Sequence, residues 1–331
     1  MARRHHALPL RRDRAIADPG SAQRTGSSAG LGWCQTNLRG DCNGTIIFAL
    51  VQSVSLRIMN VELTARVHRP EPFFREAGTG PGVVCIHSNA STSGQWRALM
   101  ELLAPKFRVL APDSYDSGKS PRWPSDRVIH LRDEAALIEP VLARAGSPLA
   151  LVGHSYGAAV ALIAALSNPG RVRALALYEP TLFALLDAEA PAPNEAEGVR
   201  DTVARASVAL DAGDANGAAE RFIDYWMGTG AWKQTPEQRR PQIIAAVMNV
   251  RRWAHALFTE PTSLDAFRSL EVPVLYMVGK RSTSSAHGVA RLLTSALPRV
   301  EVVEFESFGH MGPITHPDLV NEVIEQFLER A

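Results

Sequence analysis

The chain has 331 residues, of which 46% are hydrophobic, and this suits one large α/β domain with room for an inserted subdomain. Its 35 Lys and Arg residues nearly balance 34 Asp and Glu residues, so no strong field is expected to attract nucleic acid or an anionic membrane. Three cysteines are too few for a disulfide framework, and none belongs to a cluster with zinc-binding spacing. We therefore expect a protein of the reducing cytoplasm.

Residues 1–58 differ from the rest, because they mix arginine with Gly, Ser and Asn and show no sustained hydrophobic period. The apolar run at 46–54 is interrupted by polar residues and is too short to span a bilayer. An Arg-rich targeting peptide is one interpretation, although a clear small-residue cleavage site is missing. We favour a disordered extension, or translated sequence upstream of a start at Met59. Expressing residues 59–331 tests this, since loss of folding or activity would show that the extension matters.

From Asn60 onward, strand patterns alternate with helical patterns. The apolar run at 83–86 is continuous and bounded by turns, which is typical of a parallel strand buried on both faces. A polar loop that begins at His87 follows this run. The elements expected in this part are strands at 61–68, 72–77, 83–86 and 107–111 and helices at 96–103 and 131–145.

The next apolar run starts at Leu149 and stops at Gly153-His154-Ser155-Tyr156-Gly157, and a small-residue helical pattern at 158–165 begins at once. This predicts a buried strand that turns sharply into a helix, with one serine at the turn. The two glycines allow neighbouring backbone to pack closely against it, and the helix N-terminus directs N–H groups at Ser155. These features define the G-x-S-x-G nucleophile elbow.

A further strand at 172–178 ends at Glu179, and the alternation then stops until about residue 270. The intervening segment carries many aromatic side chains and shows helical patterns near 195–212, 215–227, 237–257 and 263–270. Strands then resume at 272–278 and 299–305, with helices at 286–296 and 318–330.

Alternating βα units of this kind predict the α/β fold class, with a doubly wound, mostly parallel central sheet and helices on both faces. Ligands should bind at the carboxyl ends of its strands. Ser155, Glu179 and His310 all fall at such strand ends or just beyond them.

These segments, in this order, resemble the α/β-hydrolase superfamily from roughly Glu71 to the C-terminus. Besides the elbow, residues 112–120 are similar to the family's A-P-D-x-x-G-x-G-x-S loop, although Asp116 stands where its first glycine usually is. The aromatic side chains of the inserted segment are typical of plain core packing. The resemblance implies a hydrolase core and an inserted helical cap, in which the same side chains would both pack the cap and line an acyl pocket. The core would comprise residues 59–180 and 271–331, and the cap residues 181–270.

A serine hydroxyl needs a base within hydrogen-bond reach, and a third group must orient that base. His310, in a turn-rich loop after the last expected strand, is our candidate, because the order Ser then His matches the family. His87 matches the family's oxyanion-loop pattern, and His154 is the variable residue of the elbow. The other seven histidines have no motif around them.

The acidic residue that would orient the histidine departs from the family pattern. The family usually places an Asp, in the form Gly-x-x-Asp, beyond the strand that follows the cap, and this chain has Ser282 there. Glu179 stands where some members carry their acid instead, and it would orient the imidazole and stabilise the imidazolium. Glu179 could also simply end its strand. Glu306 and Asp113 are weaker candidates, and a Ser–His pair without an acid is the remaining alternative.

Acyl transfer also needs backbone donors for the oxyanion. The N–H of Tyr156, directly after the nucleophile, is one expected donor. The family takes the other from a His-Gly loop, and this chain has His87-Ser88-Asn89 instead. Ser88 or Asn89 is therefore expected to donate through its backbone, with Ser88 the closer match.

We expect neither a metal nor a cofactor. Asp113 and Asp116 have no partner His or third acid nearby, which makes a poor metal site. The sequence contains no Walker loop and no G-x-G-x-x-G that opens a helix.

The resemblance implies a serine hydrolase that cleaves a carboxylic ester, or a related small acyl compound, through an acyl-enzyme on Ser155. C–C bond hydrolysis or cofactor-free perhydrolysis, which this fold hosts with the same residues, is the alternative, because fold does not decide chemistry. A non-catalytic receptor or scaffold is a third hypothesis, encouraged by Ser282. Acyl length, alcohol and oligomeric state are left open.

Overall fold

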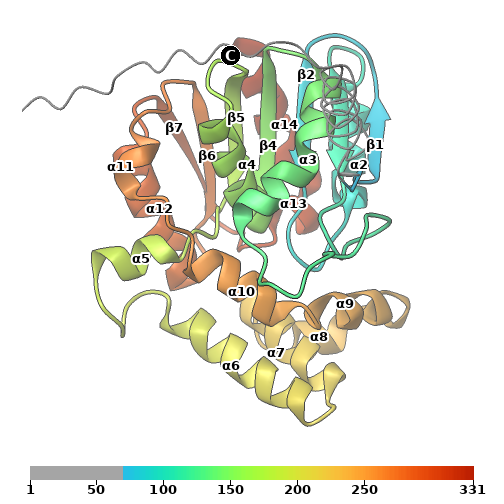
Figure 1. The fold of residues 1–331 in the computed structure, drawn as a ribbon, viewed down its shortest axis with the longest axis vertical. Coiled ribbons are helices and arrows are strands. Elements are labelled where there is room, and N and C mark those ends of the chain that lie inside the picture. The colour runs from blue at the N-terminus through green and yellow to red at the C-terminus, as the bar shows by residue number, and fades with distance from the viewer. Residues whose placement is uncertain (1–69) are drawn as a thin grey trace, which may run out of the picture. The chain divides into compact units, whose positions relative to one another are not determined.

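The structure is a computed structural model and describes residues 70–331 (Figure 1). The predictions for residues 1–58, and the strand expected at 61–68, lie outside the described residues. None of the helices in the described range combines the length with the apolar character that a membrane span requires.

Residues 70–331 contain a seven-stranded sheet with the order β1-β3-β2-β4-β5-β6-β7. β1 runs antiparallel to β3 and every other neighbouring pair is parallel, so the doubly wound, mostly parallel sheet is confirmed. The strands are β1 (Phe74–Ala77), β2 (Gly82–Ile86), β3 (Arg108–Pro112), β4 (Leu149–His154), β5 (Val172–Tyr178), β6 (Val274–Gly279) and β7 (Val300–Phe305).

Helices cover both faces of this sheet. They are α2 (Arg97–Leu103), α3 (Leu131–Ala145), α4 (Tyr156–Ser167), α12 (Ser284–Ala296) and α14 (Pro317–Arg330). α3, α4 and α12 share a buried cluster with Val84 and Leu151, whereas α2 and α14 share another with Val83 and Ala150. Because neighbouring residues of a strand point to opposite faces, the two clusters lie on opposite sides of the sheet. The central strands are therefore buried on both faces, as their continuous apolar runs predict.

Between β5 and β6 the chain forms a series of helices, of which α6 to α10 are grouped beyond one end of the sheet (Figure 1). They are α5 (Ala184–Glu189), α6 (Glu197–Asp211), α7 (Ala215–Met227), α8 (Ala231–Gln234), η2 (Glu237–Arg239), α9 (Arg240–Val247), α10 (Val250–Phe258) and α11 (Leu264–Phe267). The single helix expected at 237–257 is divided between α9 and α10. Val247, Asn249 and Val250 surround this break, and all three have low helix propensity.

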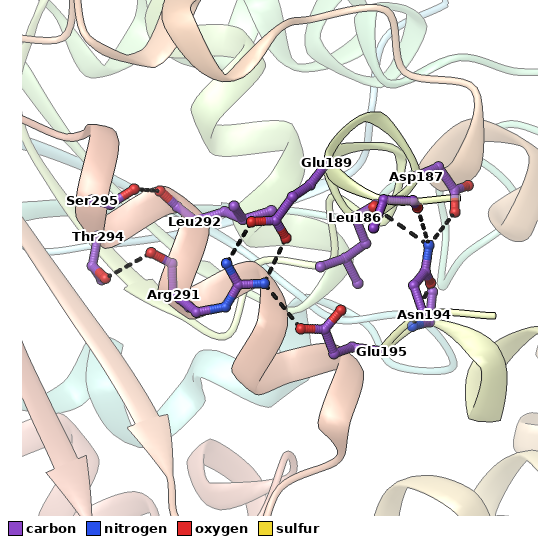
Figure 2. A network of polar contacts seen from close by, with 11 residues as sticks. Leu186, Asp187, Glu189, Asn194, Glu195, Arg291, Leu292, Thr294 and Ser295 are labelled. Atoms are coloured by element: carbon purple, nitrogen blue, oxygen red, sulfur yellow. Dashed lines mark hydrogen bonds and ion pairs between the residues drawn. The ribbon is translucent and has the colours of Figure 1, made fainter. Parts of the chain in front are cut away.

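The start of this helical segment is fastened to α12 through Arg291 (Figure 2). The Arg291 guanidinium donates to both carboxylate oxygens of Glu189, at 2.7 and 2.6 Å, and to Glu195 Oε1 at 2.9 Å. Asn194 donates to Asp187 Oδ1 at 2.9 Å and to the Ala190 carbonyl at 2.8 Å. These charged pairs are exposed and contribute little to stability. Their bidentate geometry nevertheless fixes the path of the chain as it leaves the core.

Candidate active site

The sharp strand-to-helix turn expected from the sequence is present at Ser155, between β4 and α4. The residue has φ 56° and ψ −118°, a conformation that is strained for a residue with a side chain. A Cβ added to Gly153 would lie 2.5 Å from Ala158 Cα, and one added to Gly157 would lie 2.3 Å from the Ile86 carbonyl oxygen. Side chains at either position would collide with backbone, so this turn requires glycine on both sides of the serine.

Three of the predicted residues meet in one chain of hydrogen bonds. Ser155 Oγ lies 2.8 Å from His310 Nε2, and His310 Nδ1 lies 2.7 Å from Glu179 Oε2. His310 belongs to the loop between β7 and α13 (Gly312–Thr315), and Glu179 directly follows β5. The side chains are buried, with 7% of Ser155, 2% of His310 and none of Glu179 exposed. This arrangement can move a proton from the serine hydroxyl to the imidazole while the carboxylate holds the ring in place.

The second carboxylate oxygen of Glu179 also accepts hydrogen bonds. Its Oε1 accepts from the Gly279 N–H at 2.7 Å and from the Ser282 hydroxyl at 2.5 Å. Ser282 stands where the family usually has its Asp, and here it donates a hydrogen bond to the carboxylate that reaches His310 from the neighbouring strand. Both oxygens of Glu179 thus have hydrogen-bond donors, as a buried carboxylate requires.

The other candidate acids lie elsewhere. Asp113 accepts from the backbone N–H groups of Ser93 at 2.6 Å and Lys119 at 2.9 Å, so it braces two loops. Glu306 is exposed and pairs with Lys280. Neither carboxylate contacts His310 in residues 70–331.

The predicted oxyanion donors lie beside the serine, but they differ in availability. The N–H of Tyr156 is the first amide of α4 and has no intrahelical acceptor. The N–H of Ser88 already donates to Gln95 Oε1 at 3.1 Å, whereas that of Asn89 has no hydrogen-bond partner within residues 70–331. Ser88 and Asn89 both line the cavity that contains Ser155. The geometry therefore favours Asn89 over Ser88 as the second donor.

Three of the strained backbone positions belong to this site, at Ala90, Ser155 and Glu179. Four non-glycine residues in the described range have positive φ, namely Ala90 (54°), Asp116 (55°), Ser155 (56°) and Glu179 (44°). Such conformations cost about 1–3 kcal/mol each and persist where the surrounding structure enforces them, commonly at functional sites. Asp116 replaces a family glycine, and Asp is among the residues that tolerate this region. Its carboxylate also pairs with Arg252 of α10 at 3.2 Å.

A cavity of about 900 Å³ opens at the site, with Ser155 and His310 in its wall. Its lining comes from the sheet loops, from α2 and α13, and from α6 to α10. The buried apolar part of the lining includes Phe183, Val199, Ile223, Val250, Trp253 and Leu257. The exposed part is largely polar and includes Arg97, Glu101, Gln234, Arg239 and Gln242. The cavity therefore has an apolar interior and a polar entrance.

Trp226 of α7 covers His310, with ring centroids 4.1 Å apart and an angle of 30° between the planes. It also stacks on Phe183 at 6.4 Å and meets Tyr225 edge-on at 4.8 Å. The sequence puts Trp226 in the aromatic set of the helical segment, but no sequence signal indicates that it contacts His310. The helical segment thus contributes directly to the wall around the imidazole.

One further buried ionisable group lies behind the elbow. Burial raises the pKa of Glu134, on α3, to about 8, because the charged form loses its hydration. Its carboxyl group accepts from the Tyr115 N–H at 3.2 Å and from the Tyr156 hydroxyl at 3.4 Å.

Within residues 70–331, no three His, Cys, Asp or Glu side chains are grouped as metal ligands would be.

The fold and this site define a class of protein, and comparison with known proteins identifies the family. The family model described as alpha/beta hydrolase fold matches residues 81–317, and the chain belongs to this family. It is a hydrolase enzyme of that family, as the sequence resemblance implied.

Among individual relatives, the chain is similar to several pimeloyl-[acyl-carrier protein] methyl ester esterases. The protein of that name from Aeromonas hydrophila subsp. hydrophila is 26% identical over 264 residues, which is 76% of this chain and 96% of the relative. The one from Chromobacterium violaceum is 25% identical, over 78% of this chain and 98% of the relative. Among solved structures, an alpha/beta hydrolase from Sphaerobacter thermophilus matches with a TM-score of 0.61 and 26% identity, over 77% of this chain and 95% of that one. A thermophilic esterase from Thermogutta terrifontis has a TM-score of 0.63 and 23% identity, covering 78% and 93%, and it supports the fold alone.

Proposed function

We propose that this protein hydrolyses a carboxylic ester of a small molecule through an acyl-enzyme on Ser155. The observation that carries the proposal is the 2.8 Å contact between Ser155 Oγ and His310 Nε2, with Glu179 on the other ring nitrogen at 2.7 Å. A hydroxyl within reach of a neutral imidazole can lose its proton as it attacks a carbonyl carbon.

The reaction has two matched halves. His310 takes the proton of Ser155 as Oγ bonds to the ester carbonyl carbon, and it returns that proton to the departing alkoxide. Water then enters, gives a proton to His310 and attacks the acyl group, and the proton passes back to Ser155 as the acid leaves. Glu179 accepts from Nδ1–H throughout, which holds the ring tautomer and stabilises the transient imidazolium.

Charge develops on the carbonyl oxygen in both halves. We assign the oxyanion contacts to the N–H of Tyr156 and the N–H of Asn89. Ser88 is the less favoured donor because its amide is engaged by Gln95 at 3.1 Å. Removal of one such donor in other enzymes costs roughly 2.7–4 kcal/mol of transition-state stabilisation.

The cavity supports an ester with an apolar acyl group. Its buried lining is aromatic and aliphatic, whereas its exposed lining is polar, so the acyl chain would extend inward and the polar part of the substrate toward solvent. The relatives named methyl ester esterases favour an ester over a C–C bond or a peracid as the substrate bond. In this proposal residues 181–270 act as the cap that selects the substrate. The cytoplasm, expected from the cysteine usage, remains our prediction for where the reaction occurs.

Turnover on a panel of p-nitrophenyl esters, from acetyl to dodecanoyl, tests the proposal. We expect measurable hydrolysis with an optimum at a medium acyl length, and loss of hydrolysis in Ser155→Ala. Absence of turnover on every member, with the protein folded, would favour the non-catalytic receptor. Hydrolysis that survives in Ser155→Ala would instead remove the serine from the mechanism.

A further inference from the structure

His154, the variable residue of the elbow, lies at the centre of a second hydrogen-bonded chain. Its side chain is fully buried, next to Ser155 in sequence but on a different hydrogen-bonding path. Its Nε2 lies 2.8 Å from the backbone carbonyl oxygen of His310, and its Nδ1 lies 3.1 Å from Gln95 Nε2. Gln95 Oε1 in turn accepts from the N–H and the hydroxyl of Ser88, at 3.1 and 3.0 Å.

The chemistry of the end groups permits a single arrangement of protons along this chain. The Ser88 N–H can only donate, so the amide atom that faces it must be the oxygen of Gln95. The amide nitrogen of Gln95 then donates to Nδ1 of His154, which must carry no proton. A neutral imidazole keeps its proton on Nε2, and this proton faces the His310 carbonyl, which can only accept. Each of the four contacts in the chain therefore pairs a donor with an acceptor.

The surroundings of His154 keep this arrangement in place. Burial lowers its pKa well below the ordinary value, and the neighbouring His310 acts in the same direction, since two charged imidazoles would repel each other. The rings of His154 and His310 have centroids 5.3 Å apart. When His310 gains a proton during the reaction, His154 stays neutral and keeps donating to the His310 carbonyl.

We propose that His154 and Gln95 are positioning residues that couple the oxyanion loop, residues 88–90, to the loop that carries His310. The proposal rests on the proposed function, because it assigns these residues to the alignment of the base with the oxyanion donors. Gln95 holds Ser88, so it fixes the backbone from which the adjacent Asn89 N–H projects. His154 holds the backbone of His310 itself. The His310 loop and the oxyanion loop, which must both act at the substrate carbonyl group, are thus linked through the side chains of His154 and Gln95.

The proposed coupling distinguishes the hydrogen bonds of His154 and Gln95 from a side chain that only anchors one loop. Tyr178 offers a matched control, because its hydroxyl donates to the Gly309 carbonyl at 2.9 Å and so anchors the same loop from β5. Tyr178 has no hydrogen bond to Gln95 or to the oxyanion loop in the described residues. A loop anchor and a coupling residue therefore predict different behaviour when each is combined with a change at Gln95.

A double-mutant cycle on the full-length chain tests this with Gln95→Leu, His154→Leu and Tyr178→Phe. We expect Gln95→Leu and His154→Leu each to lower kcat by roughly ten- to a hundredfold with little change in KM, the range for a lost buried hydrogen bond. The double variant should be no slower than the slower of the two, because both break the same chain. Gln95→Leu with Tyr178→Phe should show the product of the separate effects.

The same variants are also compared by the rate at which a fluorophosphonate labels Ser155. This measurement needs no knowledge of the natural substrate. His154→Gln, which keeps a donor toward the His310 carbonyl, should recover part of the rate, and it serves in place of His154→Leu if that variant does not fold. Multiplicative effects for the Gln95 and His154 pair would overturn the coupling, and so would unchanged kcat in either single variant. Wild-type protein that neither turns over esters nor reacts with the probe would contradict the proposed function instead.

Discussion

Glu179 is fully buried at the end of β5, in a backbone conformation with φ 44°. A buried carboxylate is costly unless hydrogen-bond donors surround it. Here it accepts from His310, from the Gly279 N–H and from the hydroxyl of Ser282. The usual family Asp has become Ser282, which supports a carboxylate supplied from one strand away. In the proposed mechanism this carboxylate orients His310, although the expected Asp is missing.

Glu179→Gln tests this role at the level of one residue. The amide keeps the shape of the side chain but can present its NH₂ to His310, which favours the wrong ring tautomer. We expect kcat to fall by about 10³- to 10⁴-fold with the thermal unfolding midpoint nearly unchanged, by analogy with the acid of serine proteases. Glu306→Gln, at an exposed carboxylate, is the matched control and should retain full activity. Near-normal turnover of Glu179→Gln would exclude Glu179 from the mechanism.

Ser155 carries a stability cost that substitution can reveal. Its φ of 56° is strained for any residue with a Cβ, whereas glycine adopts it easily. We expect Ser155→Gly and Ser155→Ala both to be inactive. Ser155→Gly should nevertheless have a free energy of unfolding about 1 kcal/mol higher than Ser155→Ala, measured by urea denaturation. Equal stabilities, or a less stable glycine variant, would argue against strain at the elbow.

At the scale of elements, α7 is the inserted helix whose side chain packs on the His310 imidazole. Trp226 lies on its C-terminal turn and faces His310, and its ring also stacks on Phe183 and meets Tyr225 edge-on. An indole over the imidazole shields this ring from water, and it would offer a π face to the imidazolium of the proposed mechanism. The same ring borders the cavity, so it also limits the space beside the nucleophile.

Trp226→Leu should therefore change both rate and selectivity. We expect kcat for short esters to fall, because the base loses its cover, and the ratio of kcat/KM for long over short acyl chains to rise, because the cavity is enlarged. Met227→Leu is the matched control, since Met227 is adjacent on α7, lines the cavity and is exposed. An unchanged acyl-length profile in Trp226→Leu would contradict a boundary role for this ring.

The elements were largely predictable from the sequence, and the contacts between them were not. Continuous apolar runs predicted the buried strands, since a strand covered on both faces can use apolar residues at every position. The break between α9 and α10 was missed because an apolar helical pattern continues through Asn249. The contact of Gln95 with His154 joins residues 59 positions apart in a polar loop and an elbow, and local pattern does not record such partners. The contact of Trp226 with His310 was hidden for the same reason.

At the scale of the whole molecule, the parallel sheet assembles the site. The carboxyl ends of β4 and β5 present Ser155 and Glu179 side by side, and the loop after β7 brings His310 from 155 residues beyond the serine. The helices between β5 and β6 cover this edge and, with the sheet loops, line the cavity. The site and the fold therefore share one core, and an ionisable side chain buried in that core affects the stability of the whole described fold.

Glu134 makes stability depend on pH. Its pKa in the folded protein is about 8, above the ordinary value of 4.5, so the native state holds a proton that the unfolded chain has lost. The free energy of unfolding should therefore fall as pH rises from about 4.5 to about 8, by up to about 1.4 kcal/mol per pH unit, and this contribution should level off above that range. Glu134→Gln should remove this slope in urea denaturation between these pH values. Glu322→Gln, at an exposed site on α14, should leave it, and an unchanged slope in Glu134→Gln would contradict the buried proton.

The most direct measurement of the central claim is the site and rate of fluorophosphonate labelling, followed by mass spectrometry of the peptide that contains Ser155. A hydroxyl that is activated by His310 should take up one probe per chain at Ser155, and His310→Ala should slow this reaction by orders of magnitude. An unlabelled Ser155 in the folded wild-type protein, or equal labelling rates with and without the imidazole, would contradict the account.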